Sequence, residues 1–185
     1  ARLGIAELLL SGSTAALDMG TVHHTDAIFE AAAAFGYRLT SGKAMMDRGT
    51  ERGLVESSTV SLRSSIDLAK KWHNSHDGLL RYAFAPRFIL SCSDEILQKV
   101  ARHARDMGCL IHTHASENPG EIDVVNRQYG CGNIEALHAR GCTGPDVVLA
   151  HCVWPSDVEM DLLRTTNTRV AHCPSTNLKL ASGIA

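Results

Sequence analysis

Residues 109–117 read Cys-Leu-Ile-His-Thr-His-Ala-Ser-Glu, and this stretch decides the fold. Its apolar start follows a helical pattern and a glycine, which is typical of a buried parallel strand in an α/β protein. Side chains alternate between the two faces of a strand, so His112 and His114 point to the same side. Glu117 comes where the strand gives way to a loop. Two imidazoles and a carboxylate at a strand end suggest a metal-assisted site with its own proton carrier, whereas two packed histidines and a solvated glutamate are the structural alternative.

Outward from this stretch, a unit of strand, polar loop and helix recurs along the chain. Apolar runs predict strands at 13–19, 37–44, 79–85, 147–150 and 169–171, beside the one that opens at Leu110, and a polar loop at 45–56. Helical patterns cover 2–10, 27–35, 59–72, 94–107, 121–129, 134–139 and 156–166, with Thr25 or Asp26, Ser93 and Ser156 as N-caps. No hairpin signal separates the strands, so the alternation predicts a parallel sheet with crossover helices.

Polar side chains follow the end of nearly every predicted strand. They are Asp18, Asp47, Arg87, His114 with Glu117, His151 and His172. A site assembled from many strand ends is typical of a (β/α)8 barrel, whereas an open doubly wound sheet concentrates its site at one switch point. The sequence contains neither G-x-G-x-x-G nor G-x-x-x-x-G-K-[ST], which disfavours a nucleotide-binding sheet. The pattern therefore predicts an α/β fold that is part of a (β/α)8 TIM-type barrel.

Composition bounds the class of protein. The chain has 185 residues, 44% of them hydrophobic and 21% charged, which suits one globular domain with a real core. A formal net charge of -2 gives no reason to expect nucleic acid or an anionic membrane as a partner. The six cysteines form no C-x-x-C pair, and no apolar run is long enough to cross a bilayer. We therefore expect a cytoplasmic protein with reduced thiols.

Both ends of the chain fall inside element patterns. It opens without Met in an apolar helical pattern, and it stops at residues 182–185 without a terminal element. We therefore expect residues 1–185 to be an internal piece of a barrel domain in a longer protein.

Two further histidines directly follow apolar runs. His151 comes after 147–150, and His172 comes after 169–171. A single histidine at such a place is more often a packed core or loop residue. Three such histidines in succession, together with Glu117, favour a metal hydrolase, because that class of enzyme needs neutral imidazoles held by a rigid scaffold.

Three motifs carry a more specific resemblance. They are H-T-H-A-S-E-N at 112–118, L-A-H-C-V-W at 149–154 and A-H-C-P-S-T-N-L-K-L-A-S-G at 171–183. In this order they resemble the amidohydrolase superfamily, in its branch of aminohydrolases that act on purines and related heterocycles. The resemblance runs over essentially the whole chain. It implies a (β/α)8 barrel with one divalent metal ion, usually zinc and sometimes iron.

The resemblance implies roles for individual residues. His114 matches the metal ligand of the family's fifth strand, because the family's glutamate lies three residues further on, as Glu117 does here. Glu117 then matches the carboxylate that contacts the ring nitrogen of the substrate and moves protons. His151 matches the sixth-strand histidine beside the activated water, and His112 is expected to be a packed residue deeper in the strand.

Three more residues are expected at the substrate pocket. Arg87 lies in a segment that resembles guanine deaminases, where the arginine contacts the purine, and its alternative is a surface salt bridge. His172 and Asn177 belong to a motif that shapes the pocket and does not react. The site expected from the sequence therefore has His114 for the metal and Glu117 and His151 for catalysis. Arg87, His172 and Asn177 are expected to bind the substrate.

The family's chemistry and its missing parts give further expectations. The metal makes hydroxide available, the hydroxide attacks the amino-bearing ring carbon, and ammonia leaves. Glu117 would protonate the adjacent ring nitrogen, and His151 would stabilise the developing negative oxygen. The family's first-strand H-x-H and eighth-strand Asp are absent from these 185 residues. The chain would hold about strands two to six, and we expect it to be inactive by itself.

The motifs disagree on the substrate. Residues 86–93 resemble guanine deaminases, residues 149–154 and 177–180 resemble adenosine-type deaminases, and residues 18–25 resemble 5′-deoxyadenosine deaminases. We expect an adenine nucleoside such as 5′-deoxyadenosine or S-adenosylhomocysteine, with guanine as the alternative and a triazine or pterin after it. The complete protein is expected to be a homo-oligomer. The alternatives from other classes are a non-catalytic barrel segment used for assembly, which the set of His114, Glu117 and His151 disfavours, and a phosphate-binding barrel lyase or isomerase, which would not need three strand-end histidines.

Overall fold

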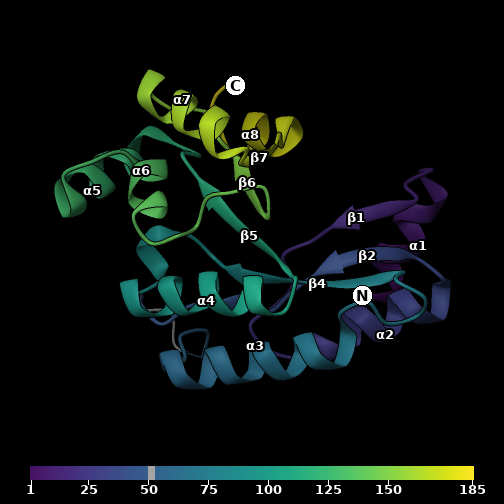
Figure 1. The fold of residues 1–185 in the computed structure, drawn as a ribbon. Coiled ribbons are helices and arrows are strands. Elements are labelled where there is room, and N and C mark those ends of the chain that lie inside the picture. Colours follow the sequence, from purple (N-terminus) through teal and green to yellow (C-terminus); the bar gives the residue numbers. More distant parts are fainter. Residues whose placement is uncertain (50–52) are drawn as a thin grey trace.

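A curved, all-parallel sheet forms the centre of the molecule, and helices pack along its outside (Figure 1). The computed structural model describes residues 1–49 and 53–185, so residues 50–52 of the expected polar loop lie outside the described residues. The strands are β1 (Ala15–Leu17), β2 (Arg38–Ser41), β3 (Ala44–Met45), β4 (Leu80–Pro86), β5 (Leu110–Ala115), β6 (Val147–His151) and β7 (Arg169–Ala171).

Strand order separates the two candidate architectures. The sheet runs β1-β2-β4-β5-β6-β7 in chain order, with β3 paired to β4 off this path, and every pair is parallel. A doubly wound sheet would reverse its order at a switch point, whereas an arc of a barrel adds each strand beside the last one. The predicted fold class, part of a (β/α)8 barrel, is confirmed. The path holds six strands, which is one more than strands two to six would supply.

Helices precede, connect and follow the strands. They are α1 (Arg2–Leu10), α2 (Asp26–Phe35), α3 (Ser58–Trp72), α4 (Asp94–Asp106), α5 (Pro119–Tyr129), α6 (Asn133–His138), α7 (Asp157–Thr166) and α8 (Pro174–Lys179), with a 3-10 turn at Ile89–Ser91. Ser93 caps α4 through Ile96 N–H, and Ser156 with Glu159 forms the predicted capping box of α7. Thr25 stands at the N-cap of α2 without a side-chain cap bond, because its hydroxyl donates to the Thr21 carbonyl.

The strand predicted at 37–44 is divided at Gly42. A Cβ atom at Gly42 would lie 1.7 Å from the backbone carbonyl oxygen of Ala83, so only glycine lets the two backbones approach this closely. The chain bends there, β2 ends at Ser41, and β3 begins at Ala44. Periodicity could not reveal this contact, because Ala83 belongs to a strand that is distant in the sequence.

The hydrophobic core lies between the sheet and the helices. The Phe29 ring of α2 stacks on the Trp72 ring of α3 at 5.3 Å between centroids, and the Tyr82 ring of β4 lies 6.1 Å from Phe29. The side of α4 that faces the sheet is buried through Ile96, Leu97, Val100, Ala101 and Ala104. This packing fixes the strands, and the strands in turn fix the residues that follow their carboxyl ends.

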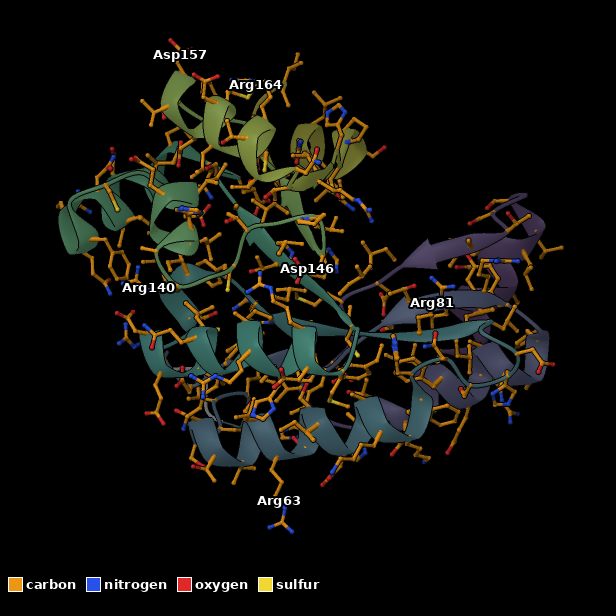
Figure 2. The ribbon with its side chains drawn as sticks, in the orientation of Figure 1. Arg63, Arg81, Arg140, Asp146, Asp157 and Arg164 are labelled. Atoms are coloured by element: carbon orange, nitrogen blue, oxygen red, sulfur yellow. The ribbon has the colours of Figure 1, made fainter. Side chains whose placement is uncertain are left out.

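Ion pairs join neighbouring helices outside this core. Arg140, labelled in Figure 2, donates from Nε to Asp94 Oδ1 at 2.7 Å and from Nη2 to Oδ2 at 2.8 Å, and so ties the turn that follows α6 to the start of α4. Arg63 of α3, also labelled there, projects away from the molecule.

The six cysteines are free thiols, and burial raises the pKa of Cys142 to about 12. Among the helices that the structure describes, none is long and apolar enough to cross a membrane.

Candidate active site at the strand ends

The register of β5 and β6 brings the predicted catalytic residues together. His114 pairs with Ala150, and Ala115 pairs with His151. The rings of His114 and His151 stack with centroids 5.3 Å apart, and His151 Nε2 lies 3.8 Å from Glu117 Oε2. Two imidazoles and one carboxylate therefore occupy one end of two adjacent strands, as the sequence predicts.

His114 is held in the protonation state that a metal ligand requires. Its Nδ1 lies 2.7 Å from the Arg87 carbonyl oxygen, which can only accept, so Nδ1 carries the proton and Nε2 keeps its lone pair. Burial is the main cause that lowers the pKa of His114, so the ring is neutral near pH 7. A backbone carbonyl behind a ligating histidine is the usual way to fix its tautomer and orientation.

Glu117 follows a sharp turn at the end of β5. Ser116 has a φ of 50°, in the left-handed region, and its carbonyl accepts hydrogen bonds from Val153 N–H at 2.9 Å and Trp154 N–H at 3.1 Å. These two bonds tie the turn to the loop after β6. The Glu117 side chain remains 23% exposed, which leaves it open to a substrate.

His151 is strained and buried. It has a φ of 75°, Cys152 has a φ of 45°, and Cys152 N–H donates to the Ala115 carbonyl at 3.0 Å. Left-handed backbone in such residues costs about 1 to 2 kcal/mol each and tends to gather at functional sites. Asn177 of α8, 1% exposed, accepts through Oδ1 from His151 Nδ1 at 2.7 Å. The predicted pocket residue Asn177 therefore acts directly on His151.

A small cavity joins Arg87 to the site. Its volume is about 220 Å³, and it is lined by Arg87, Phe88, His114, Glu117, Asn118 and Glu121. Arg87 is exposed, and its guanidinium lies 5.3 Å from the centre of the Phe88 ring. Arg87 Nη1 also donates to Met46 Sδ at 3.7 Å, so Met46 and Phe88 both contact this side chain at the rim of the cavity. A larger cavity of about 960 Å³ lies along α7 and β7, and none of these six residues lines it.

Two other predicted positions differ from this group. His172 is exposed after β7, and within the described part of the chain no hydrogen bond, ion pair or ring contact joins it to His114, Glu117 or His151. His112 is 6% exposed, as expected of a packed residue, and burial lowers its pKa to about 4. His112 Nδ1 is buried and has no hydrogen-bond partner among the described residues.

Polar residues at two other strand ends serve the fold. Asp18 Oδ2 accepts from Ser41 Oγ at 2.8 Å, which ties β1 to β2. Asp47 Oδ1 accepts from Ser93 N–H at 2.6 Å, at the N-cap of α4, and Asp47 Oδ2 accepts from Ser58 Oγ of α3 at 2.5 Å. A polar residue after a strand is therefore not sufficient evidence for a place in the site.

Comparison with known proteins decides the family. The family model described as the amidohydrolase family matches residues 1–185. The chain belongs to the amidohydrolase family. The resemblance read from the three motifs is thereby confirmed.

Relatives of this amidohydrolase chain are named as deaminases. It is 39% identical over 183 residues to 5-methylthioadenosine/S-adenosylhomocysteine deaminase 2 of Archaeoglobus fulgidus, covering 99% of this chain and 42% of that protein. It is 38% identical over 185 residues to guanine deaminase of Escherichia coli, covering 97% and 42%. It is 36% identical over 185 residues to 5′-deoxyadenosine deaminase of Methanothermobacter thermautotrophicus, covering 100% and 42%. The chain spans less than half the length of each.

Solved structures agree with the fold. Escherichia coli guanine deaminase superposes with a TM-score of 0.93 at 38% identity, over 98% of this chain and 44% of that one. Atrazine chlorohydrolase from Arthrobacter aurescens, whose structure is described as complexed with zinc, superposes with a TM-score of 0.92 at 25% identity, over 100% and 44%. These superpositions show that the chain shares the fold of the corresponding part of both proteins.

The ligand set within this amidohydrolase chain is small. Among the residues that the structure describes, no group of three or more His, Cys, Asp or Glu side chains could hold a metal ion. His114 fits one ligand position, because its Nε2 carries a lone pair on a fixed ring. A metal site that uses His114 therefore needs further ligands beyond those that the described His, Cys, Asp and Glu side chains supply.

The sequence reasoning missed Glu121. It lies at the third position of α5, its carboxylate lines the 220 Å³ cavity, and it is only 9% exposed. Asn118 at the N-cap and Glu121 three residues later form the spacing of a capping box, which is a recognisable signal. That signal indicates a helix start, and it does not reveal that the carboxylate reaches back to Glu117.

Proposed function

We propose that the complete protein carrying this chain is a metal-dependent hydrolytic deaminase of a purine nucleoside or base, and that residues 1–185 form part of its barrel domain. The observation that carries the proposal is the meeting of His114, Glu117 and His151 at the ends of β5 and β6. These residues supply a ligating nitrogen, a proton carrier and a second imidazole in one place. The deaminase names of the relatives support the same reaction class.

His114 is the proposed metal ligand. Its Nδ1–H bond to the Arg87 carbonyl leaves Nε2 available for a divalent ion, for which zinc is the first choice and iron the second. Such an ion, when bound, makes an activated water available near neutral pH. The part of this chain in that chemistry is to hold one ligand rigidly at the end of β5.

Glu117 is the proposed proton carrier. Attack on the amino-bearing ring carbon drives electron density onto the adjacent ring nitrogen, so a proton must reach that nitrogen. The Glu117 carboxyl group lines the cavity beside His114 and can deliver it. The proton that the attacking oxygen gives up passes to the amino group, which departs as ammonia when the C–N bond breaks, while the ring carbon keeps the oxygen.

His151 is the proposed partner of the developing negative oxygen. Its Nδ1–H donates to Asn177 Oδ1, which fixes the ring, and the imidazolium form would also donate from Nε2 to the developing negative oxygen. Asn177 thus sets the orientation of the ring, and Ser182 Oγ, 3.4 Å from Glu117 Oε1, joins the segment after α8 to the carboxylate. Both contacts tie residues 177–182 to the reacting groups.

Arg87 is the proposed contact for the heterocycle. Its exposed guanidinium stands at the rim of the cavity that Glu117 and His114 line. A planar guanidinium can donate to ring nitrogens or oxygens and can also stack on an aromatic face. His172 is proposed to shape the outer pocket, and we further expect the complete protein to be cytoplasmic and homo-oligomeric.

An adenine nucleoside is the preferred substrate class. The segments at 149–154 and 177–180 favour 5′-deoxyadenosine or S-adenosylhomocysteine. Guanine is the second candidate, because Arg87 lies in the guanine-deaminase-like segment and at the rim of the cavity. The relatives at 39% and 38% identity carry different substrates in their names, so they leave this choice to experiment. A triazine or pterin ranks after both.

The test is ammonia release by the complete protein, with its bound metal quantified. 5′-Deoxyadenosine, S-adenosylhomocysteine and guanine are assayed in parallel at equal concentration. Release from one purine supports the proposal and identifies the substrate. No release from any purine by protein that holds stoichiometric metal contradicts the purine assignment in favour of a triazine or pterin, and protein that binds no metal contradicts the mechanism.

A further inference from the structure

Glu121 is a buried carboxylate that the proposed reaction does not use. It lies in the first turn of α5 and lines the same cavity as Glu117. Only 9% of the residue is exposed, and burial is the main cause that raises its pKa. A buried acid beside a reacting acid is costly unless its oxygens have firm partners.

One oxygen of Glu121 holds the backbone of Glu117. Oε2 accepts from Glu117 N–H at 3.0 Å, while Glu121 N–H donates to Asn118 Oδ1 at 3.0 Å. The two bonds run in opposite directions across residues 117–121 and close this segment on itself. The segment begins at the left-handed Ser116, so the position of Glu117 depends on how its own N–H is bound.

The other oxygen of Glu121 is anchored to α6. Oε1 accepts from Asn133 Nδ2 at 2.8 Å, and Asn133 is fully buried at the start of α6. Asn133 Oδ1 is also buried and has no hydrogen-bond partner among the described residues. One oxygen of the Glu121 carboxylate is therefore held by α6, and the other oxygen holds the backbone N–H of Glu117.

We propose that Glu121 is a positioning residue for Glu117, which it holds at the reacting nitrogen through the Glu117 N–H and the Asn133 anchor. This role rests on the proposed function. Positioning groups of this kind typically affect rate by about tenfold to a hundredfold, because a small displacement of a proton carrier lowers the fraction of productive encounters.

Two variants separate position from charge. Glu121→Ala removes both hydrogen bonds, so Glu117 N–H loses its acceptor. Glu121→Gln keeps an oxygen for Glu117 N–H, and its new amide can donate to Asn133 Oδ1 once the Asn133 amide turns over and presents its oxygen in place of Nδ2. If position is what matters, the glutamine variant retains activity although the charge is gone.

Glu159→Ala is the matched control. Glu159 is a buried carboxylate, 3% exposed, that accepts from Ile134 N–H at 2.6 Å and Ser156 N–H at 2.9 Å. Like Glu121, it holds the start of a helix through two bonds, but neither bond goes to Glu117. Its removal reports the cost of losing such a carboxylate in general.

The experiment compares kcat and KM for ammonia release, with melting temperatures, in the complete protein. We expect Glu121→Ala to lower kcat by about tenfold or more with little change in KM, Glu121→Gln to restore kcat, and Glu159→Ala to lower the melting temperature while kcat remains. Amide exchange in a peptide spanning 115–121 should be faster in Glu121→Ala only, and not in Glu121→Gln or Glu159→Ala. Equal kcat in Glu121→Ala and wild type overturns the inference. A wild-type protein that releases no ammonia overturns the proposed function instead.

Discussion

At the scale of single residues, hydrogen-bond partners decide what each imidazole can do. His114 donates from Nδ1 to the Arg87 carbonyl, and His151 donates from Nδ1 to the Asn177 amide oxygen, so Nε2 is the remaining nitrogen of both rings. The proposed roles of His114 and His151 therefore differ because different groups surround the two rings. The acceptor for His114 is a backbone carbonyl, which a substitution of Arg87 would keep. The acceptor for His151 is the Asn177 side chain, which a substitution removes.

We predict that Asn177→Leu lowers kcat for deamination by about tenfold, because His151 loses the acceptor that orients its ring. Asn177→Asp should retain most of the activity, since an aspartate oxygen accepts from Nδ1 in the same place. Steady-state kinetics of the two variants in the complete protein make the comparison. Equal activity in Asn177→Leu and Asn177→Asp would show that this bond has no part in catalysis.

Sequence reasoning located the site through position after a strand. That rule selected His114 and His151 correctly as neighbours, because parallel strands place their ends together. The same rule selected His172, which is exposed and makes no contact with them in the described residues. Glu121 and the Asn177 bond escaped it, since each depends on a helix that returns to the strand ends, and no local pattern encodes that return.

At the scale of elements, close contacts between segments distant in sequence explain the differences from prediction. The predicted strand 37–44 is divided because Gly42 lies against the Ala83 carbonyl. The helix starts at Ser93 and Ser156 were predictable, because each cap bond joins residues only three apart. Hydrogen bonds between residues close in sequence can be predicted from the sequence, whereas contacts between distant strands cannot.

We predict that Gly42→Ala destabilises the protein by about 1 to 3 kcal/mol, because the new methyl group would meet the Ala83 carbonyl and push β2 from β4. Thermal unfolding of the variant beside wild type measures the loss. Gly4→Ala is the control, since a Cβ at Gly4 meets no atom within 4 Å. An unchanged melting temperature in Gly42→Ala would contradict the close approach.

The junction of α3 and β4 gives a pH dependence. Tyr82 N–H donates to His73 Nδ1 at 3.2 Å, and burial holds the pKa of His73 below its ordinary value of 6.5. The unfolded chain therefore takes up a proton at higher pH than the folded one, so this stabilisation is complete above pH 6.5 and declines as the pH falls below it. Urea unfolding at several pH values should show a smaller decline for His73→Asn, which keeps an acceptor and does not titrate. Identical pH slopes in both proteins would refute this.

At the scale of the whole molecule, the six-strand arc presents two sheet edges. β1 and β7 each pair on one side only within the described sheet, and large apolar side chains such as Leu3, Leu10 and Ile184 are exposed at 74%, 89% and 82%. Unpaired strand edges and exposed apolar residues favour association. The relatives extend well beyond the matched region, and the chain covers 42% of their length.

We predict that residues 1–185 expressed alone self-associate, bind zinc weakly and release no ammonia from purines. One proposed ligand, His114, is too few for a tight site, and the apolar surface has no cover. Size-exclusion chromatography, zinc titration and the ammonia assay provide the three readouts. A monodisperse 185-residue chain with deaminase activity would contradict this directly.

The most direct test of the proposed site is one comparison in the complete protein, between wild type and Glu117→Gln. Ammonia release and bound metal are measured for both with the preferred purine. If Glu117 carries the proton, the variant retains stoichiometric metal and folds normally but loses activity by about a hundredfold or more. If Glu117→Gln deaminates the purine at the wild-type rate with the same metal content, the carboxylate at the end of β5 is not the proton carrier, and the catalytic site lies elsewhere.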